Sequence, residues 1–196
     1  MSAPEPQIRR PDPVLLIVAT FSRHRELLTW AQQQLQESYG SIYLSTEPFL
    51  FDHTSYYEAS MGTELQKQLH AFEALVPTDS LPEKKHHAIT LEEAVIRKES
   101  YPEDRPLNVD PGYLTLGKFL LASTKDHSHR VYLRDGIFAE VTLQYRNKQF
   151  LPWPWTYADY QQPLVLDFLT QARQYLYSRL RQSPTGVIYE IQEDDA

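Results

Sequence analysis

The chain has 196 residues, of which 41% are hydrophobic and 23% are charged, and its formal net charge at pH 7 is -7. This composition is typical of a globular protein rather than a disordered chain. The absence of cysteine excludes disulfides, zinc-thiolate sites and thiol catalysis. The negative charge argues against non-specific binding of nucleic acid, which needs a basic surface.

The length fits a single domain. Residues 1–12 hold three prolines and little to bury, so we predict a disordered leader there. Residues 13–191 are predicted to form the domain, and residues 192–196 an acidic tail. No apolar run is long enough to cross a bilayer, and no signal-peptide pattern is present. We therefore expect a cytosolic protein that makes no membrane contact.

The first predicted elements form a strand–helix–strand unit, which is right-handed by default. Residues 14–20 are continuously apolar and β-branched, as in a central strand that is covered on both faces. Helical spacing follows at Leu27, Leu28, Ala31 and Leu35, and Gly40 ends that helix. Short strands are predicted at 42–44 and 49–51.

A loop without regular period, at residues 52–62, is the first candidate functional segment. The spacing of four apolar residues then predicts a helix: Leu65, Leu69, Phe72 and Val76. The prolines of residues 77–82 end it, and a weaker helix is predicted at 91–98.

In the second half, a strand at 107–110 is predicted to turn at Pro111-Gly112 into a short helix at 116–125. The longest helix begins at Pro163, which suits a first helical turn, and an edge strand is predicted at 187–191. The resulting fold class is α+β: a single domain with a mixed, mainly antiparallel sheet, helices largely on one face, an initial β-α-β unit and a long C-terminal helix.

Residues 130–145 contain the clearest hairpin, around Asp135-Gly136. A three-residue loop at 134–136 is favoured because it separates apolar from charged side chains on the two faces. In that register three pairs face each other: Val131 and Ala139, Leu133 and Ile137, and Arg130 and Glu140.

The segment from Gly112 to Phe119 satisfies most of the phosphate-loop pattern G-x-x-x-x-G-K-[ST], but Phe119 stands where a hydroxyl should hold Mg²⁺. No nucleotide site or other cofactor motif is therefore predicted. A softer interpretation places an anion at the predicted helix start beside Asp110, with Lys118 about one turn on. The alternative is that Asp110 only caps the turn.

His127 and His129 precede a strand, and with Glu140 or Asp110 they offer metal ligands for an alternative function, a metal-dependent hydrolase. The favoured hairpin register instead pairs Glu140 with Arg130, so no metal site is predicted. A second alternative is a protein–protein interaction module, formed by the last helix and the aromatic residues of 153–160: Trp153, Trp155, Tyr157 and Tyr160.

Several motifs in order resemble the bacterial domain-of-unknown-function family 4416: D-P-G-Y-L-T at 110–115, L-A-S-T-K-D at 121–126, H-R-V-Y-L at 129–133, G-I-F-A-E-V-T-L at 136–143 and P-W-T-Y-A-D-Y at 154–160. The segment F-D-H-T-S-Y-Y-E-A-S-M-G at 51–62 resembles it too. Members are often labelled GTP-binding proteins. The resemblance directs attention to polar positions in these motifs: Asp52, Tyr56, Tyr57, Glu58, Asp110, Lys118, Lys125, Asp126, His129, Arg130 and Glu140.

The leading hypothesis is a polar pocket for an anionic small ligand, for example a phosphorylated one. Its predicted members are Asp52, Tyr56, Glu58, Asp110, Lys118, Lys125 and Arg130. In this hypothesis Lys125 and Arg130 bind the anion, while Asp110 and Glu140 orient them. His129 exchanges protons near neutral pH, so His129, Asp110 and Glu140 are the catalytic candidates if turnover occurs.

Overall fold

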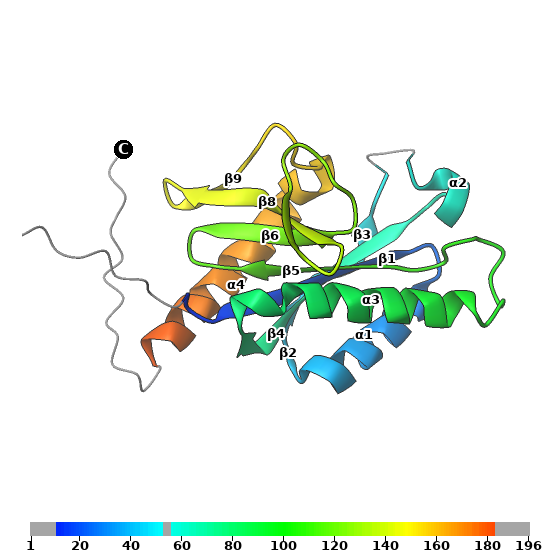
Figure 1. Cartoon of the computed structure of the whole chain (residues 1–196), viewed down its shortest axis with the longest axis horizontal. Helices are drawn as coiled ribbons and strands as arrows, with labels where there is room; N and C mark the ends of the chain where they lie inside the picture. The colour runs from blue at the N-terminus through cyan, green and yellow to red at the C-terminus, as the bar shows by residue number, and fades with distance from the viewer. Residues whose placement is uncertain (1–10, 53–55, 183–196) are drawn as a thin grey trace, which may run out of the picture.

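A computed structural model of the chain describes residues 11–52 and 56–182 (Figure 1). Most of the predicted leader, the predicted strand at 187–191 and the acidic tail lie outside these residues. Within them, no helix is long and apolar enough to span a membrane.

The strands of the described part of the chain form one antiparallel sheet. In chain order they are β1 (Val14–Ser22), β2 (Ile42–Ser45), β3 (Phe49–Leu50), β4 (Gln66–Val76), β5 (Asn108–Leu114), β6 (Lys118–Ser123), β7 (Val131–Arg134), β8 (Ile137–Arg146) and β9 (Gln149–Pro152). Their order across the sheet is β2-β4-β1-β5-β6-β8-β7, with β3 beside β4 and β9 beside β8.

The first half of the chain has split β-α-β connectivity. Both β1 and β2 are antiparallel to β4, so they run parallel to each other with β4 between them. Helices α1 (Arg25–Tyr39) and α3 (Leu81–Ile96) connect these strands in the order β-α-β-β-α-β, which is the ferredoxin-like arrangement. The second half adds β6 to β9 and the long helix α4 (Pro163–Arg181).

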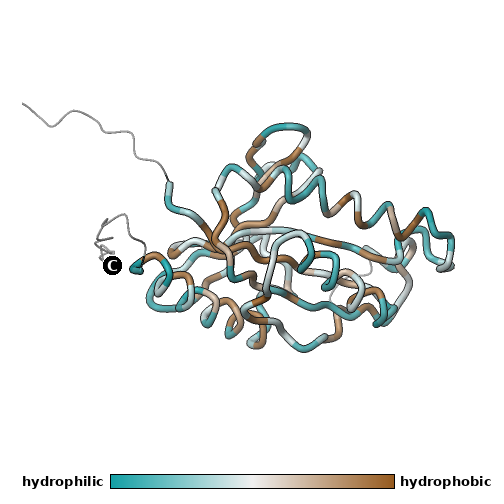
Figure 2. Tube along the Cα trace, turned by 90° about the horizontal axis from the view of Figure 1, so that it is seen from below, coloured by the Kyte–Doolittle hydropathy of each residue, from teal (hydrophilic) through white to brown (hydrophobic). Residues whose placement is uncertain are grey.

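Helices cover both faces of the sheet. Two of the three long helices, α1 and α3, share one face, where Leu16, Val18 and Phe72 pack against them. The long helix α4 covers the other face through a core that includes Ile17 and Leu69, and Figure 1 shows it passing behind the strands. Every residue of β1 is buried, as predicted for a central strand. Figure 2 shows apolar and hydrophilic residues alternating along the helices, as one-sided packing requires.

The helix predicted from Leu65 to Val76 is wrong, because this segment is strand β4. Leu69 belongs to the core under α4, whereas Phe72 belongs to the core under α1. A strand with both faces covered does not alternate apolar and polar residues, so its apolar residues fell at helical spacing. The prolines of residues 77–82 were expected to end a helix. They stand at the start of one instead, since Pro82 lies in the first turn of α3.

The turn at Pro111-Gly112 and the helix at 116–125 are also wrong. Both turn residues continue strand β5, opposite Val18 and Ile17 of β1, and the helix is replaced by β6. Gly112 serves close packing of strands, because a Cβ atom there would lie 2.1 Å from the carbonyl oxygen of Leu120.

The hairpin register is half right. Val131 faces Ala139 as predicted, but Ile137 faces Arg134 rather than Leu133, which is bulged. The turn has two residues, Asp135 and Gly136, and both have positive φ, as a type I′ turn requires. The bulge therefore places Arg134 where Leu133 was predicted, and Val131 and Leu133 are exposed rather than part of a buried apolar face.

Candidate functional site

Three buried ion pairs gather where β1 ends, and we call them the ion-pair cluster. The pairs are Lys67 with Asp159, Lys85 with Asp110, and Arg130 with Glu140. Their members come from several elements that are distant in sequence: β4, β5, β8, α3, the loop before β7 and the 3₁₀ helix η2 (Ala158–Gln161). Burying charged pairs is costly relative to apolar packing, so their concentration at one end of the sheet makes this end the candidate site.

The pair of Lys67 and Asp159 is the most deeply buried. Lys67 Nζ lies 2.5 Å from Asp159 Oδ2, and each side chain is 3% exposed. Aromatic rings enclose the ammonium, with the Tyr160 centroid at 3.9 Å and the Phe51 centroid at 5.2 Å. Ring faces attract a cation and the carboxylate balances its charge, so Lys67 is held as an ammonium inside the domain.

The pair of Lys85 and Asp110 lies where strands β5 and β6 separate. The β5–β6 pairing covers only Gly112 to Leu114 of β5, and Asp110 lies two residues before the first paired residue. Lys85 Nζ, from helix α3, donates to Asp110 Oδ1 and to the Val109 carbonyl, both at 2.9 Å. Because Pro111 lacks an N–H group, it cannot extend the β-ladder through hydrogen bonding, and the opening is filled by a charged side chain.

Asp110 is kept ionised by its neighbours. Burial acts to raise the pKa of its carboxyl group, but the charge and hydrogen bond of Lys85, the charge of Lys67 and a hydrogen bond from Asn108 outweigh it. The net effect holds the pKa of Asp110 below its ordinary value. With a quarter of its side chain exposed, Asp110 is the carboxylate of the cluster that a ligand can reach.

A second layer of contacts braces this pair. Asn108 Nδ2 donates to Asp110 Oδ2 at 2.7 Å, and Asn108 Oδ1 accepts from Arg105 Nη2. Glu92 of α3 accepts from Arg105 at 3.1 Å and from the Val109 backbone at 2.8 Å. Burial raises the pKa of Glu92 despite the nearby charges of Lys85 and Arg105. The loop before β5 is thereby tied to α3.

The pair of Arg130 and Glu140 confirms the contact that the hairpin predicted. Arg130 Nε donates to Glu140 Oε2 at 2.8 Å, and the two side chains are 5% and 2% exposed. Arg130 Nη1 also donates to Ser123 Oγ at 2.6 Å and to the Lys125 carbonyl at 3.1 Å. Among the described residues, none accepts a hydrogen bond from Arg130 Nη2.

A column of stacked rings lies beside this pair. His129 stacks between His127 and Trp155 at centroid distances of 5.8 and 5.3 Å, and Trp155 stacks on Trp153 at 5.3 Å. His129 Nε2 lies 3.3 Å from Glu140 Oε2. Trp155 Nε1 donates to the Val141 carbonyl at 3.0 Å. The tryptophans thus cover β8. Of the four aromatic residues predicted as an interaction surface, Trp153, Trp155, Tyr157 and Tyr160, only Tyr157 is largely exposed.

The electrostatic effects show that the three pairs form one cluster. Burial raises the pKa of Tyr160 well above its ordinary value, and the charges of Asp159, Asp110 and Glu140 raise it further. The Tyr160 hydroxyl is buried and has no hydrogen-bond partner among the residues described. Tyr57 also has a raised pKa, from burial and then from the charge of Asp110. One carboxylate from each pair therefore acts on the same phenol.

The exposed edge of the cluster is positively charged. Lys125 Nζ donates to the Tyr56 hydroxyl and lies 4.3 Å from the centre of its ring. This hydrogen bond, the charge of Lys125 and the more distant charge of Arg105 lower the pKa of Tyr56. Among the described carboxylates, none forms an ion pair with Lys125. We call Tyr56, Arg105, Lys125, His129 and Arg130 the rim.

The structure brings most of the predicted site residues together. Tyr56, Asp110, Lys125, His129, Arg130 and Glu140 belong to the cluster or its rim. Asp110 orients Lys85, however, and not Lys125 or Arg130 as hypothesised. Asp52 and Glu58 are exposed residues on either side of the undescribed residues 53–55.

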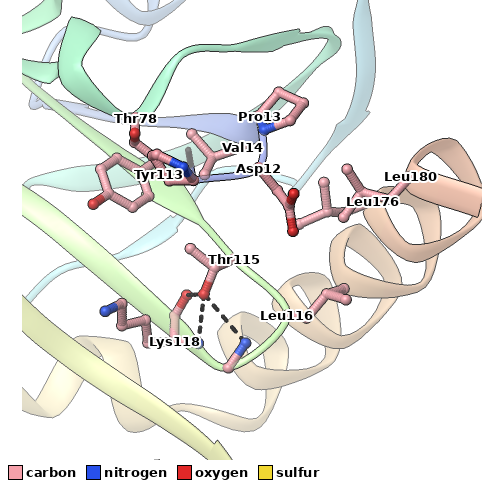
Figure 3. Close-up of a pocket in the computed structure, with 12 residues that line it drawn as sticks. Asp12, Pro13, Val14, Thr78, Tyr113, Thr115, Leu116, Lys118, Leu176 and Leu180 are labelled. Atoms are coloured by element: carbon pink, nitrogen blue, oxygen red, sulfur yellow. Dashed lines mark hydrogen bonds between the residues drawn. The ribbon is translucent and has the colours of Figure 1, made fainter. Parts of the chain in front are cut away.

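Lys118 is not part of this cluster. It begins β6, opposite Gln144, whereas Ser123 at the other end of the strand contacts Arg130. Lys118 lines a cavity of about 470 Å³ with Asp12, Leu176 and Leu180. Figure 3 shows this cavity between the start of β1, the β5–β6 turn and α4. Thr115 Oγ1 holds the turn by accepting from the Gly117 and Lys118 amides at 3.2 and 3.0 Å.

Sequence reasoning missed Lys67, Lys85, Arg105 and Asp159. The available signals were a lysine inside the apolar segment at 65–76 and an acid within the aromatic motif at 154–160. Neither signal identifies its partner, because Lys67 and Asp159 lie far apart in sequence.

The alternative functions gain no support from the geometry. Across residues 11–52 and 56–182, no three His, Asp or Glu side chains are close enough together to hold a metal ion, so His127 and His129 do not complete a hydrolase centre there. Of the aromatic residues predicted to form an interaction surface, Trp153, Trp155 and Tyr160 are at least half buried, and only Tyr157 is largely exposed.

The comparisons with known proteins identify a family and nothing more specific. Neither the curated proteins nor the solved structures gave a match. One family model covers residues 12–176 of the chain, a span that includes every member of the ion-pair cluster. The chain therefore belongs to the family described as Domain of unknown function (DUF4416).

Proposed function

We propose that this protein binds a small anionic molecule at the rim of the ion-pair cluster. The observation that carries the proposal is the cation at the rim that forms no ion pair with a described carboxylate. Of the five cations linked by the contacts above, Lys67, Lys85, Arg105 and Arg130 each pair with a carboxylate, in order Asp159, Asp110, Glu92 and Glu140, whereas Lys125 contacts the Tyr56 hydroxyl. The unbalanced cation is Lys125, which is exposed at the rim.

The arrangement of donors favours an oxyanion such as a phosphate or a carboxylate. Arg130 is held rigidly because Glu140 and Ser123 accept from its Nε and Nη1 atoms, which leaves Nη2 to face a ligand. Lys125 adds a second positive donor from the same loop. Guanidinium and ammonium donors together suit phosphate and carboxylate oxygens, and preorganisation by buried partners reduces the entropy lost on binding.

A thermal-shift measurement with inorganic phosphate at constant ionic strength tests this proposal. Phosphate should raise the unfolding midpoint of the protein, because a ligand that binds only the folded state stabilises it by mass action. Lys125→Ala should remove most of that rise without lowering the midpoint in the absence of phosphate, since Lys125 is exposed.

The matched control is Lys118→Ala, at the opposite end of β6. It removes the same charge from the chain and should leave the response to phosphate unchanged. Equal losses in the two variants, or an equal rise with chloride at the same ionic strength, would show that general charge screening causes the effect.

A further inference from the structure

The His129 ring is held in one orientation by groups on several sides. Trp155 and His127 stack on its faces with interplanar angles of 13° and 14°. Its Nε2 atom lies 3.3 Å from the buried Oε2 atom of Glu140. The His129 side chain is 22% exposed, against 2% for Glu140. One nitrogen therefore faces the interior, and the rest of the ring lies at the rim.

The carboxylate of Glu140 favours one tautomer of this ring. Glu140 accepts from Arg130 Nε at 2.8 Å and from Thr142 Oγ1 at 3.4 Å, so the carboxylate acts as an acceptor. Because a carboxylate attracts an N–H group and repels a lone pair, the neutral His129 ring should carry its hydrogen on Nε2, the nitrogen 3.3 Å from Glu140. In the neutral ring this leaves Nδ1 as a bare acceptor, and no described residue donates to it.

The open Nδ1 atom belongs to the loop that supplies the anion donors. Lys125, His129 and Arg130 lie within six residues of one another, and Arg130 Nη1 joins the loop to itself through the Lys125 carbonyl at 3.1 Å. An imidazole beside an oxyanion can donate to it when protonated and accept a proton from it when neutral.

We propose that His129 is the proton-transfer group of the anion site and that Glu140 is its positioning residue. In the forward direction the Nδ1–H bond of the imidazolium breaks, and the proton moves to an oxygen of the bound oxyanion, which forms an O–H bond. The reverse step returns the proton to Nδ1, so no other reactant is needed. The ligand is then an oxyanion that titrates near neutral pH, as a phosphate monoester does, since its second pKa is about 6. This inference rests on the proposed anion site.

The charged groups that face His129 decide whether phosphate binds more tightly to the protonated or to the neutral ring. Glu140 from β8 is negative, Arg130 from the same loop is positive, and His127 is stacked on the ring, while the aromatic loop presents uncharged Trp155. A bound oxyanion adds negative charge beside Nδ1. Negative charge there attracts the imidazolium, so phosphate should bind more tightly when His129 is protonated.

Long-range ¹H–¹⁵N spectra of the histidine rings test the first step without any ligand. The ring of His129, assigned with His129→Gln, should show the Nε2–H tautomer above its pKa. Glu140→Gln should change it to a mixture of tautomers, because an amide can donate as well as accept. His127→Gln is the matched control and should leave the His129 tautomer unchanged. A tautomer mixture in the unmodified protein, or an unchanged tautomer in Glu140→Gln, overturns the inference.

Phosphate binding at two pH values tests the second step. His129→Gln should weaken phosphate binding about tenfold at pH 6, the loss of one charge-assisted hydrogen bond, and by less than about twofold at pH 8, where an ordinary imidazole carries no charge. Equal weakening at both pH values overturns proton transfer. If phosphate fails to bind the unmodified protein at either pH, the proposed function fails, whereas the tautomer result still decides the role of Glu140.

Discussion

Charged side chains are buried in pairs at one end of the sheet and exposed at the other. Where β1 ends, charged side chains are taken inside and paired, as in Lys67 with Asp159. Where β1 begins, Lys118 is exposed, and the neighbouring cavity has an apolar wall that includes Leu176 and Leu180. Stability alone does not explain the difference, since apolar residues of similar volume often replace a buried ion pair without loss. The contrast is the one that the proposed anion site requires.

The largest expected effect comes from breaking the most buried pair. Lys67→Met should lower the free energy of unfolding by about 3–5 kcal/mol, because it leaves Asp159 buried without a partner. Urea denaturation measures the change. Lys118→Met is the control for the other end of the sheet and should stay within about 0.5 kcal/mol of the unmodified protein.

The double variant separates charge from packing. Lys67→Met combined with Asp159→Leu should cost less than the sum of the two single changes, since neither charge remains buried and unpaired. If Lys67→Met alone costs no more than Lys118→Met, the two ends do not differ and the contrast is wrong.

His70 sharpens the comparison, because it is a buried titratable group without a charged partner. Its Nδ1 atom contacts Ser45 Oγ at 2.8 Å, its Nε2 atom has no hydrogen-bond partner among the described residues, and burial lowers its pKa to about 4. Between pH 6.5 and about 4, His70 is therefore protonated in the unfolded chain but neutral in the folded protein. Stability should fall by about 1.4 kcal/mol for each unit from pH 6.5 down to 4.

Denaturation midpoints of the protein and of His70→Gln across this pH range check the effect. The variant should show a smaller loss of stability on acidification, because the group that titrates is gone. Parallel curves for the two proteins would mean that His70 is protonated without penalty and that its burial matters little.

Gly112 and Gly117 stand at the two ends of the apparent phosphate loop and give a matched pair. A Cβ atom on Gly112 would lie 2.1 Å from the Leu120 carbonyl oxygen, whereas one on Gly117 meets nothing within 4 Å. Gly112→Ala should destabilise the protein by about 1–3 kcal/mol through overpacking, and Gly117→Ala by less than about 0.5 kcal/mol. Thermal unfolding compares them. Equal effects would show that β5 and β6 separate easily.

The same pair shows which parts of the fold the sequence predicts. Patterns with a local cause were interpreted correctly: the apolar run of β1, the spacing of α1 and the proline that starts α4. Gly112 was interpreted as a turn residue because glycine has two roles, positive φ and close approach of backbones. The sequence alone does not distinguish these two roles. Only the neighbouring strand distinguishes them.

The candidate site was predicted where its residues share one hairpin. Arg130 and Glu140 face each other across a single turn, so their pairing follows from the register. Lys67 and Asp159 are separated by 92 positions, and nothing local indicates that the aromatic loop folds over β4. Lys118 was placed beside Asp110 because a β-strand was interpreted as a helix, whereas the extended chain carries it to the opposite end of β6 from the ion-pair cluster.

The smallest expected effect concerns Asp110, whose side chain is partly exposed. Burial raises the pKa of its carboxyl group, but the charges of Lys85 and Lys67 lower this pKa by more than burial raises it. The pKa in the folded protein therefore lies below the pKa in the unfolded chain. The ionised form therefore stabilises the fold at pH values above about 3.9, the unfolded pKa. That stability is lost as the pH falls through the folded pKa. Asp110→Asn should thus be less stable than the unmodified protein at pH 6, and the gap should narrow at pH 3. Urea denaturation at both pH values measures it. A gap that stays constant would mean that the loss does not come from the charge of Asp110, but from contacts that the asparagine amide fails to replace.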